Sequence, residues 1–346
     1  MPVEVAGATK RIGLALSGGG FRAAAFHLGV FRRLLALGLL WKLDRLSCVS
    51  GGSIAGAFLA LHWGDAAALD ELDEFLASES LAGKAFFFGL FDPLDSRLDK
   101  LAGMYDAHLF RKARLGALRA GPTLHLNATN LATGNRFAFV CGANRDSVMG
   151  DHETGYAAAD DFSLARAVAA SSAFPPVFAP MKIKHDVFSN AGFEFVSLTD
   201  GGVYDNLGVN PLLRWGTRSE EEKAKDLDYA IVSDAGKPFD LDETPTRFGS
   251  KTVFKSIDIL MEQVRGMQFS RLRLQHAANG RPQPMWFSID SNVDPSKKAH
   301  DADAIAASKI KTNLKKLSDA DRALLARHGG NLVEARIRAW APDLIR

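Results

Sequence analysis

Two short apolar segments near the N-terminus each end in small residues and then continue into a helical pattern. The first, residues 12–16, is followed by a glycine loop at 17–20 and by apolar residues at helical spacing up to residue 37. The second, residues 43–49, is followed by a glycine-rich stretch at 51–56 and an Ala-rich helix. Parallel neighbours need a long crossover connection, which is usually a helix, whereas a tight turn joins antiparallel strands. The repeated unit therefore predicts a helix-covered parallel sheet.

The rest of the chain continues the α/β pattern. Residues 123–130 and 135–140 alternate like paired strands across a turn at Thr133-Gly134. Further strands are expected at 193–199, 229–233 and 285–289, and helices at 163–170, 251–278 and 302–340. We predict one α/β domain over residues 1–346 with a mostly parallel sheet covered by helices on both faces. Its core spans about residues 10–235, with a helical insertion at about 66–120 and a helical tail at about 297–346.

Composition excludes several classes of protein. With 47% hydrophobic and 24% charged residues, the 346-residue chain is neither disordered nor a coiled coil. A net charge of +2 gives no reason to expect nucleic acid as a partner, and two cysteines are too few for a disulfide framework. No apolar run reaches the roughly 18 residues of a membrane span, and no secretory signal begins the sequence. We expect a cytoplasmic protein that touches membranes only at their surface.

The second glycine-rich stretch has the context of a nucleophile elbow. Gly51-Gly52-Ser53-Ile54-Ala55 approximates the G-x-S-x-G string at a strand-to-helix turn, with alanine in place of the last glycine. At such a turn the serine hydroxyl projects outward and the next N–H points at an incoming carbonyl oxygen. Ser53 is thus the candidate nucleophile, and the Ile54 N–H a candidate oxyanion donor. The alternative is a glycine turn in which Ser53 only caps a helix.

The first glycine loop exposes backbone donors. Gly18, Gly19 and Gly20 permit positive φ and leave N–H groups uncovered at a helix start, an arrangement that suits an anion. Both a phosphate cradle and an oxyanion hole use it. No G-K-[ST] follows, and the pairing with a second strand–loop–helix unit favours the oxyanion hole. Arg22 is a candidate for binding an anionic head group, or a solvated residue of the first helical turn.

A serine hydroxyl needs a base to become a nucleophile. None of the nine histidines lies in a turn of special geometry, whereas Asp200 ends a predicted strand and precedes two glycines that allow a tight turn. Because parallel strands end at one edge of a sheet, Asp200 and Ser53 are expected to meet there. A carboxylate has a free pKa of about 4, so this role requires a water-poor cleft that raises the pKa.

Taken in order, these motifs resemble the patatin-like phospholipase family, whose pattern is an S-G-G-G-x-R-G loop, a G-x-S-x-G elbow and a D-G-[GA] motif. The matching stretches are residues 17–23, 51–55 and 200–202, and residues 169–175 and 205–208 look like the family as well. The resemblance covers about residues 10–215. Ala23 and Ala55 stand where the family has glycine, and neither change removes a reacting group.

The resemblance implies a serine acyl hydrolase with a Ser–Asp dyad and without histidine, metal or cofactor. Carried over, Ser53 attacks the ester carbonyl, Asp200 takes its proton, and Gly18, Gly19 and Gly20 donate N–H groups to the oxyanion. Water then releases the acyl group. The family acts on phospholipids and other lipid esters, so the expected partner is a lipid substrate.

Two segments are candidates for lipid contact. Phe86, Phe87, Phe88, Leu90 and Phe91 could form a lid, an acyl-tunnel wall or an interfacial patch, or pack within the helical insertion. The tail from residue 297 holds eleven Lys and Arg against six Asp and Glu, and residues 305–317 place lysines between apolar residues at helical spacing. Such a helix binds anionic lipid surfaces or packs its apolar stripe on the protein.

Three other interpretations stay open. An α/β-hydrolase esterase would pair Ser53 with a downstream histidine such as His276 or His328. A non-enzymatic module would bind an anion or nucleotide at residues 17–20. Acyl transfer to an alcohol would use the same residues as hydrolysis.

Overall fold

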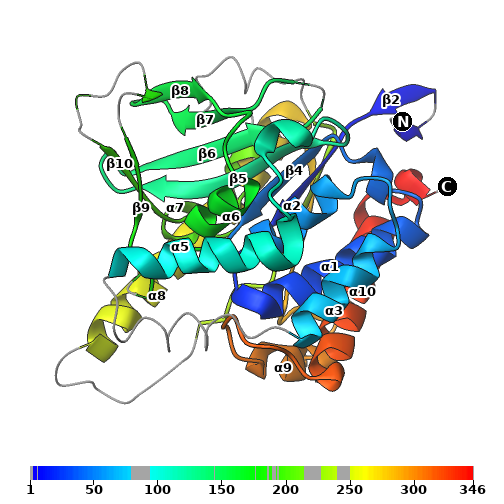
Figure 1. Ribbon diagram of the computed structural model, residues 1–346. Coiled ribbons are helices and arrows are strands. Elements are labelled where there is room, and N and C mark those ends of the chain that lie inside the picture. The colour runs from blue at the N-terminus through cyan, green and yellow to red at the C-terminus, as the bar shows by residue number, and fades with distance from the viewer. Residues whose placement is uncertain are drawn as a thin grey trace.

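Ten of the described strands form one mixed β-sheet (Figure 1). The computed structural model describes residues 3–345 except residues 6, 79–93, 144, 176, 185–186, 189–191, 193–194, 214–226 and 240–249. The strands of the sheet are β3 (Ile12–Leu16), β4 (Arg45–Val49), β5 (Thr123–Asn130), β6 (Asn135–Cys141), β7 (Val148–Asp151), β8 (Gly155–Ala158), β9 (Met181–Lys184), β10 (Phe195–Asp200), β11 (Tyr229–Asp234) and β12 (Gln283–Ser288). A separate hairpin consists of β1 (Val3–Val5) and β2 (Ala8–Lys10).

The sheet has a parallel half and an antiparallel half. Its order is β12-β11-β3-β4-β5-β6-β7-β8, and β10 joins at β5 and carries β9. Neighbouring strands from β12 to β5 are parallel, while all pairings of β6, β7, β8, β9 and β10 are antiparallel. The predicted sheet is therefore present, with a larger antiparallel share than the sequence suggested.

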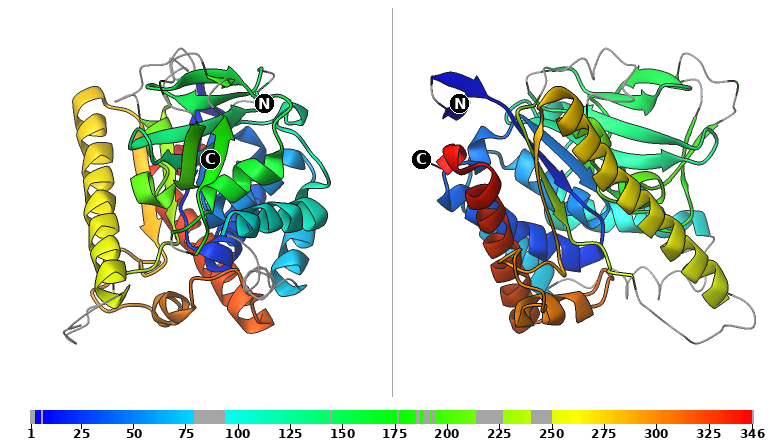
Figure 2. Two further views of the ribbon diagram at one scale, coloured as in Figure 1. Left: turned by 60° about the vertical axis from the view of Figure 1, so that its left-hand side comes forward. Right: turned by 180° about the vertical axis from the view of Figure 1, so that it is seen from behind.

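Helices cover both faces of the sheet, as Figure 2 shows most clearly. One face carries α1 (Gly20–Ala36), α2 (Gly51–Leu61), α3 (Ala68–Ser78), α5 (Leu94–Tyr105), α6 (Leu164–Ser171) and α10 (Asp319–Trp340), and the other carries α8 (Ser250–Asn279). The short helices α7 (Gly202–Asp205) and α9 (Ala302–Lys309) lie in connections. The predicted α/β fold with a helical C-terminal region is confirmed. Among the described helices, none combines the length and the apolar character needed to cross a bilayer.

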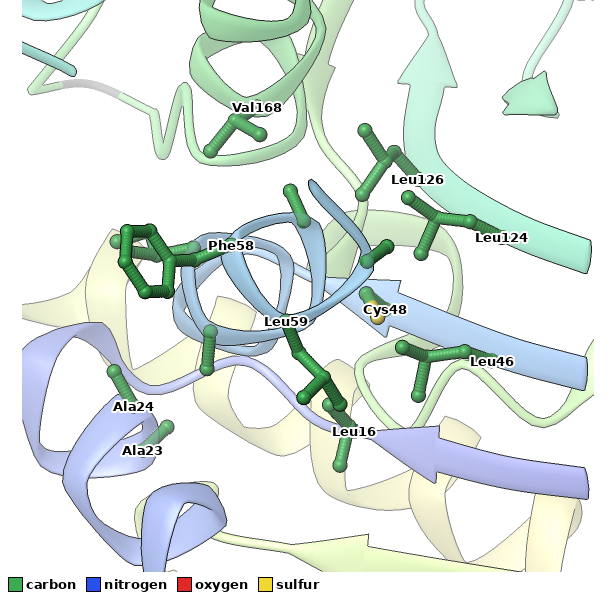
Figure 3. Close-up of a cluster of buried hydrophobic side chains, with 14 of the residues drawn as sticks. Leu16, Ala23, Ala24, Leu46, Cys48, Phe58, Leu59, Leu124, Leu126 and Val168 are labelled. Carbon is green, nitrogen blue, oxygen red and sulfur yellow. The ribbon is translucent and has the colours of Figure 1, made fainter. Parts of the chain in front are cut away.

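The core around α2 explains the small residues of that helix. Figure 3 shows α2 lying over β3, β4 and β5, with Leu16, Leu46 and Cys48 beneath it. A Cβ atom on Gly52 would lie 2.5 Å from the Leu16 carbonyl oxygen, and one on Gly56 would lie 2.3 Å from Cys48 Sγ. Glycine at these positions lets the helix approach the strands closely, and this approach fixes how the first turn of α2 sits on the end of β4.

Strands β4 and β10 meet end to end beside β5. β4 runs parallel to β5 and ends with Val49 opposite Asn127, whereas β10 runs antiparallel to β5 and ends with Asp200 opposite Ala128. The other edge of β5 is occupied by β6 along its length. β10 therefore continues the line of β4 from the opposite direction. The last residues of the two strands, Val49 and Asp200, therefore lie opposite consecutive residues of β5.

The C-terminal region differs from the prediction between α9 and α10. Residues 310–318 are not helical, although the sequence placed their apolar residues at helical spacing. This segment crosses the start of α1, where the Asn313 carbonyl accepts the Phe21 N–H at 2.9 Å. Contacts with α1 replace the helical hydrogen bonds that propensity alone would favour. The predicted lysine-bearing amphipathic helix across residues 305–317 is therefore wrong.

Candidate active site

Ser50 forms the turn between β4 and α2 in a strained backbone conformation. Its φ is 50° and its ψ is −116°, a combination that costs a non-glycine residue about 1–3 kcal/mol. Its carbonyl accepts the Ser53 and Ile54 N–H groups at 2.9 and 3.2 Å, which starts the helix. The residue is partly exposed. A strained serine directly between a strand and a helix is the geometry of a nucleophile elbow.

Asp200 lies opposite this turn and is buried. Burial raises the pKa of its carboxyl group to about 7, and hydrogen bonds from the Gly202 N–H and the Ser50 side chain oppose the rise. Oδ1 accepts the Gly202 N–H at 2.7 Å. Oδ2 is enclosed and makes no hydrogen bond of regular geometry in the described part of the chain. Oδ2 therefore has capacity to accept a proton.

Ser53 does not take the position that the sequence predicted for it. It is the third residue of α2 and has 0% of its surface exposed. Its hydroxyl lies 2.7 Å from Ser171 Oγ at the end of α6. The Ile54 N–H, predicted to face an oxyanion, donates to the Ser50 carbonyl. Because β4 ends at Val49, position 53 is already inside the helix, and the structure pairs Asp200 with Ser50 instead.

The sequence holds a second elbow-like string, which places the serine at position 50. Cys48-Val49-Ser50-Gly51-Gly52 also approximates G-x-S-x-G, with cysteine in place of the first glycine. This string begins on the predicted strand itself, so its serine falls directly after the strand. The competing string starts three residues later and matches the glycine pattern equally well.

The glycine loop passes directly beside Ser50. A Cβ atom on Gly18 would lie 3.1 Å from Ser50 Cβ. The Gly18 N–H donates to the Asn206 carbonyl at 3.1 Å, so it is not available to a ligand. The predicted donor role of Gly18 is therefore contradicted, and its place against Ser50 is steric.

Gly19 and Gly20 keep the donor geometry that the sequence predicted. Both have positive φ, 140° and 61°. Among the described residues no acceptor is found for either N–H. A Cβ atom on Gly51 would lie only 2.2 Å from the Gly20 carbonyl oxygen, so the two turns are in backbone contact. The Gly51 N–H, the first of α2, also has no acceptor within its helix.

Arg22 is a structural residue in this fold. Its side chain is 1% exposed, and its Nη1 and Nη2 donate to the carbonyls of Ile310 and Ala235, both at 2.9 Å. Burial lowers the pKa of its guanidinium to about 10. Arg22 forms part of the wall of a cavity of about 690 Å³, and each of its terminal nitrogens donates one hydrogen bond to the protein. The structure therefore shows it joining α1 to residues 235 and 310, and the binding of a head group stays a prediction.

A buried histidine, for which the sequence indicated no role, supports the glycine loop from below. His27 Nε2 lies 3.0 Å from the Ser17 carbonyl, and Nδ1 lies 2.9 Å from Ser233 Oγ. Burial lowers its pKa to about 4, so the ring is neutral at pH 7. Since a carbonyl only accepts, Nε2 carries the proton and Nδ1 accepts from Ser233. The ring thereby ties the loop to the end of β11.

The two histidines considered as alternative bases are hydrogen-bonded to backbone carbonyls and not to either serine of the elbow. His276 Nδ1 is hydrogen-bonded to the Pro282 carbonyl, and His328 Nε2 to the Ile289 carbonyl at 2.9 Å. Across the described ranges, no group of three or more His, Cys, Asp or Glu side chains is placed to hold a metal ion. The aromatic run at residues 86–91 lies outside the described residues.

Comparisons with known proteins agree with this arrangement at the level of family and fold. A family model described as patatin-like phospholipase matches residues 14–213. Human GIVD cytosolic phospholipase A2 has a similar structure, with a TM-score of 0.56 and 14% sequence identity over 97% of this chain. The same human protein in complex with methyl gamma-linolenyl fluorophosphonate inhibitor and terbium chloride gives a TM-score of 0.52, with 14% identity over 97% of this chain.

The chain spans only part of the length of the solved structures that it resembles. The chain covers 60% of the human protein in the first structure and 59% in the second. At 14% identity the similarity establishes a shared fold. A comparison with curated proteins returned no match.

Proposed function

The chain belongs to the patatin-like phospholipase family, and on this premise we propose that it is a lipid acyl hydrolase with Ser50 as nucleophile and Asp200 as general base. The substrates are carboxylic esters of phospholipids or related lipids, the class that gives the family its name. The observation that carries the proposal is the strained, partly exposed Ser50 opposite a buried carboxyl group with a pKa of about 7.

The raised pKa makes Asp200 a usable base. A general base works best when its pKa lies near the working pH, because it is then both ionised and willing to take a proton. A carboxylate with its free pKa of about 4 would bind the serine proton too weakly. Burial supplies the shift at Asp200, and Oδ2 is the oxygen with room for the proton.

Hydrolysis then proceeds through an acyl-enzyme. Ser50 Oγ attacks the ester carbonyl carbon while its proton moves to Asp200, and the carbonyl oxygen becomes an oxyanion. Collapse of the tetrahedral intermediate breaks the ester bond, and Asp200 returns the proton to the leaving alcohol. Water attacks the acyl-Ser50 carbonyl with Asp200 again as base. The carboxylic acid leaves and Ser50 regains its proton.

The oxyanion is stabilised by backbone N–H groups of Gly19, Gly20 and Gly51. The free donors of Gly19 and Gly20 and the contact between Gly20 and Gly51 support this assignment. Loss of one oxyanion donor typically costs an enzyme about 3–4 kcal/mol of transition-state stabilisation. These backbone groups should therefore be about as important for the rate as the activation of Ser50 by Asp200.

Two serine variants test the proposal. Ser50→Ala should abolish both hydrolysis of phospholipid vesicles and covalent labelling by an alkyl fluorophosphonate, whereas Ser53→Ala should still be labelled at Ser50. Mass spectrometry of the labelled peptide and of the released lipids provides the readout, and circular dichroism checks that both variants fold. Labelling of Ser53, or undiminished hydrolysis by Ser50→Ala, would overturn the assignment.

A further inference from the structure

A second serine, Ser171, holds the backbone of Ser50 in place. Ser171 is the last residue of α6 and is completely buried. Its hydroxyl oxygen accepts the Ser50 N–H at 3.1 Å and donates to the Asn127 carbonyl at 2.6 Å. The Ser53 hydroxyl lies 2.7 Å away from the same oxygen. Three separate elements, β5, α2 and the elbow, thus converge on one hydroxyl group.

The valence of this hydroxyl fixes the direction of every bond. A serine hydroxyl has one proton to donate and two lone pairs to accept with. A backbone carbonyl only accepts, so the Ser171 proton goes to Asn127. The two lone pairs then receive the Ser50 N–H and the Ser53 O–H, and no capacity remains. Ser53 therefore donates to Ser171, whose neutral hydroxyl is not a base that could activate it.

The N–H of Ser50 has no partner in regular secondary structure, since β4 ends at Val49 and α2 begins at Gly51. A residue held at φ 50° and ψ −116° persists only where its surroundings determine the conformation. The carbonyl side of Ser50 is fixed by the first turn of α2. Ser171 fixes the amide side, and without its hydroxyl the Ser50 N–H would lose its acceptor.

The same residue also contacts the turn that carries the base. The Ser171 carbonyl accepts the Gly201 N–H at 3.2 Å, directly after Asp200. Resting on the proposed roles of Ser50 and Asp200, we infer that Ser171 is a positioning residue that sets the nucleophile elbow and the Asp200 turn at a fixed separation. Ser53 assists by orienting the Ser171 hydroxyl.

The inference is tested with Ser171→Ala and the neighbouring Ser172→Ala. Ser171→Ala should lower kcat for a soluble aryl ester by about 10- to 100-fold, because small misplacement of a catalytic group has effects of this size. KM should stay within about twofold, and fluorophosphonate labelling of Ser50 should slow by the same factor as kcat. The midpoint of the pH profile should move little, since burial, the largest influence on the Asp200 pKa, is retained. Ser172, whose hydroxyl donates to the Val168 carbonyl, is the matched control, and Ser172→Ala should stay within about twofold of wild type.

The following results would contradict or support the positioning role of Ser171. Equal losses in Ser171→Ala and Ser172→Ala, or a loss seen only in KM, would show a merely structural role and overturn the inference. If Ser171→Ala does not fold, Ser171→Cys decides, because the thiol fills the site with a side chain of the same shape but accepts hydrogen bonds only weakly. A slower kcat with unchanged KM in Ser171→Cys supports positioning, and a wild-type kcat refutes it. Undiminished hydrolysis by Ser50→Ala would instead refute the proposed function itself.

Discussion

The ionisation of Asp200 should control the pH dependence of ester hydrolysis. The free carboxyl group has a pKa of about 4, whereas burial raises the pKa of Asp200 in the folded protein to about 7. Only the ionised form can take the Ser50 proton. The kcat/KM value should therefore rise with pH and follow the ionised fraction of this one group.

The expected magnitude follows from the pKa. A group with a pKa of about 7 is about half ionised at pH 7, about nine-tenths ionised at pH 8, and about one-hundredth ionised at pH 5. The kcat/KM value at pH 5 should thus be roughly 100-fold below its plateau and fall about tenfold per unit below pH 7. A carboxyl group with an ordinary pKa would be almost fully ionised at pH 5 and give a flat profile.

A soluble aryl ester measured from pH 5 to pH 9 provides the assay. Its own charge does not change in this range, and kcat/KM reports groups of the free enzyme. Thermal melting at each pH confirms that the protein stays folded, and Asp200→Asn should be inactive throughout. A flat profile between pH 5 and pH 8 would refute the reasoning. An acidic limb that persists in residual activity of Asp200→Asn would assign the pH dependence to another group.

Three further predictions concern stability and packing. The pKa of Asp200 is higher in the folded than in the unfolded protein, so the native state binds more protons between about pH 4 and pH 7, and Asp200 makes the protein less stable as pH rises through this window. The free energy of unfolding of Asp200→Asn, measured by urea denaturation, should therefore exceed that of wild type by up to about 4 kcal/mol at pH 8. The two proteins should show no such difference at pH 3.5. His27 affects stability in the opposite direction, because its pKa of about 4 in the folded protein lies below the unfolded value of about 6.5. Its contribution to the free energy of unfolding is therefore lost as pH falls from about 6.5 to 4. His27→Gln should lack this pH dependence of stability, which chemical denaturation at several pH values measures. Gly51→Ala should lower both Tm and hydrolysis, because its Cβ would lie 2.2 Å from the Gly20 carbonyl oxygen, whereas Gly266→Ala in α8 meets nothing within 4 Å and should add about 0.5–1 kcal/mol without loss of activity. Equal effects of the two glycine substitutions on hydrolysis would contradict the packing argument.

Local patterns in the sequence were enough to predict individual strands, helices and glycine loops. The fully buried β3 and the helix after it follow from a short apolar run, a glycine loop and apolar residues at helical spacing. The backbone geometry of Gly19 and Gly20 is also local, because glycine permits their positive φ at little cost. Gly201 after Asp200 has ordinary helical dihedrals, and glycine is needed there for space, since a Cβ atom would lie 2.3 Å from the Asn127 carbonyl oxygen. The α/β class of the fold could be predicted for the same reason.

The tertiary structure decided which residues face one another. The choice between Ser50 and Ser53 depends on where β4 ends, and both strings match the elbow pattern about equally well. Asp200 reaches the elbow because β10 runs antiparallel to β5 and ends where β4 ends, not because parallel strands share an edge. The raised pKa of Asp200 and the engagement of Arg22 arise from burial by distant segments. Strand order, register and burial depend on contacts between residues far apart in the chain, and short-range periodicity carries no information about them.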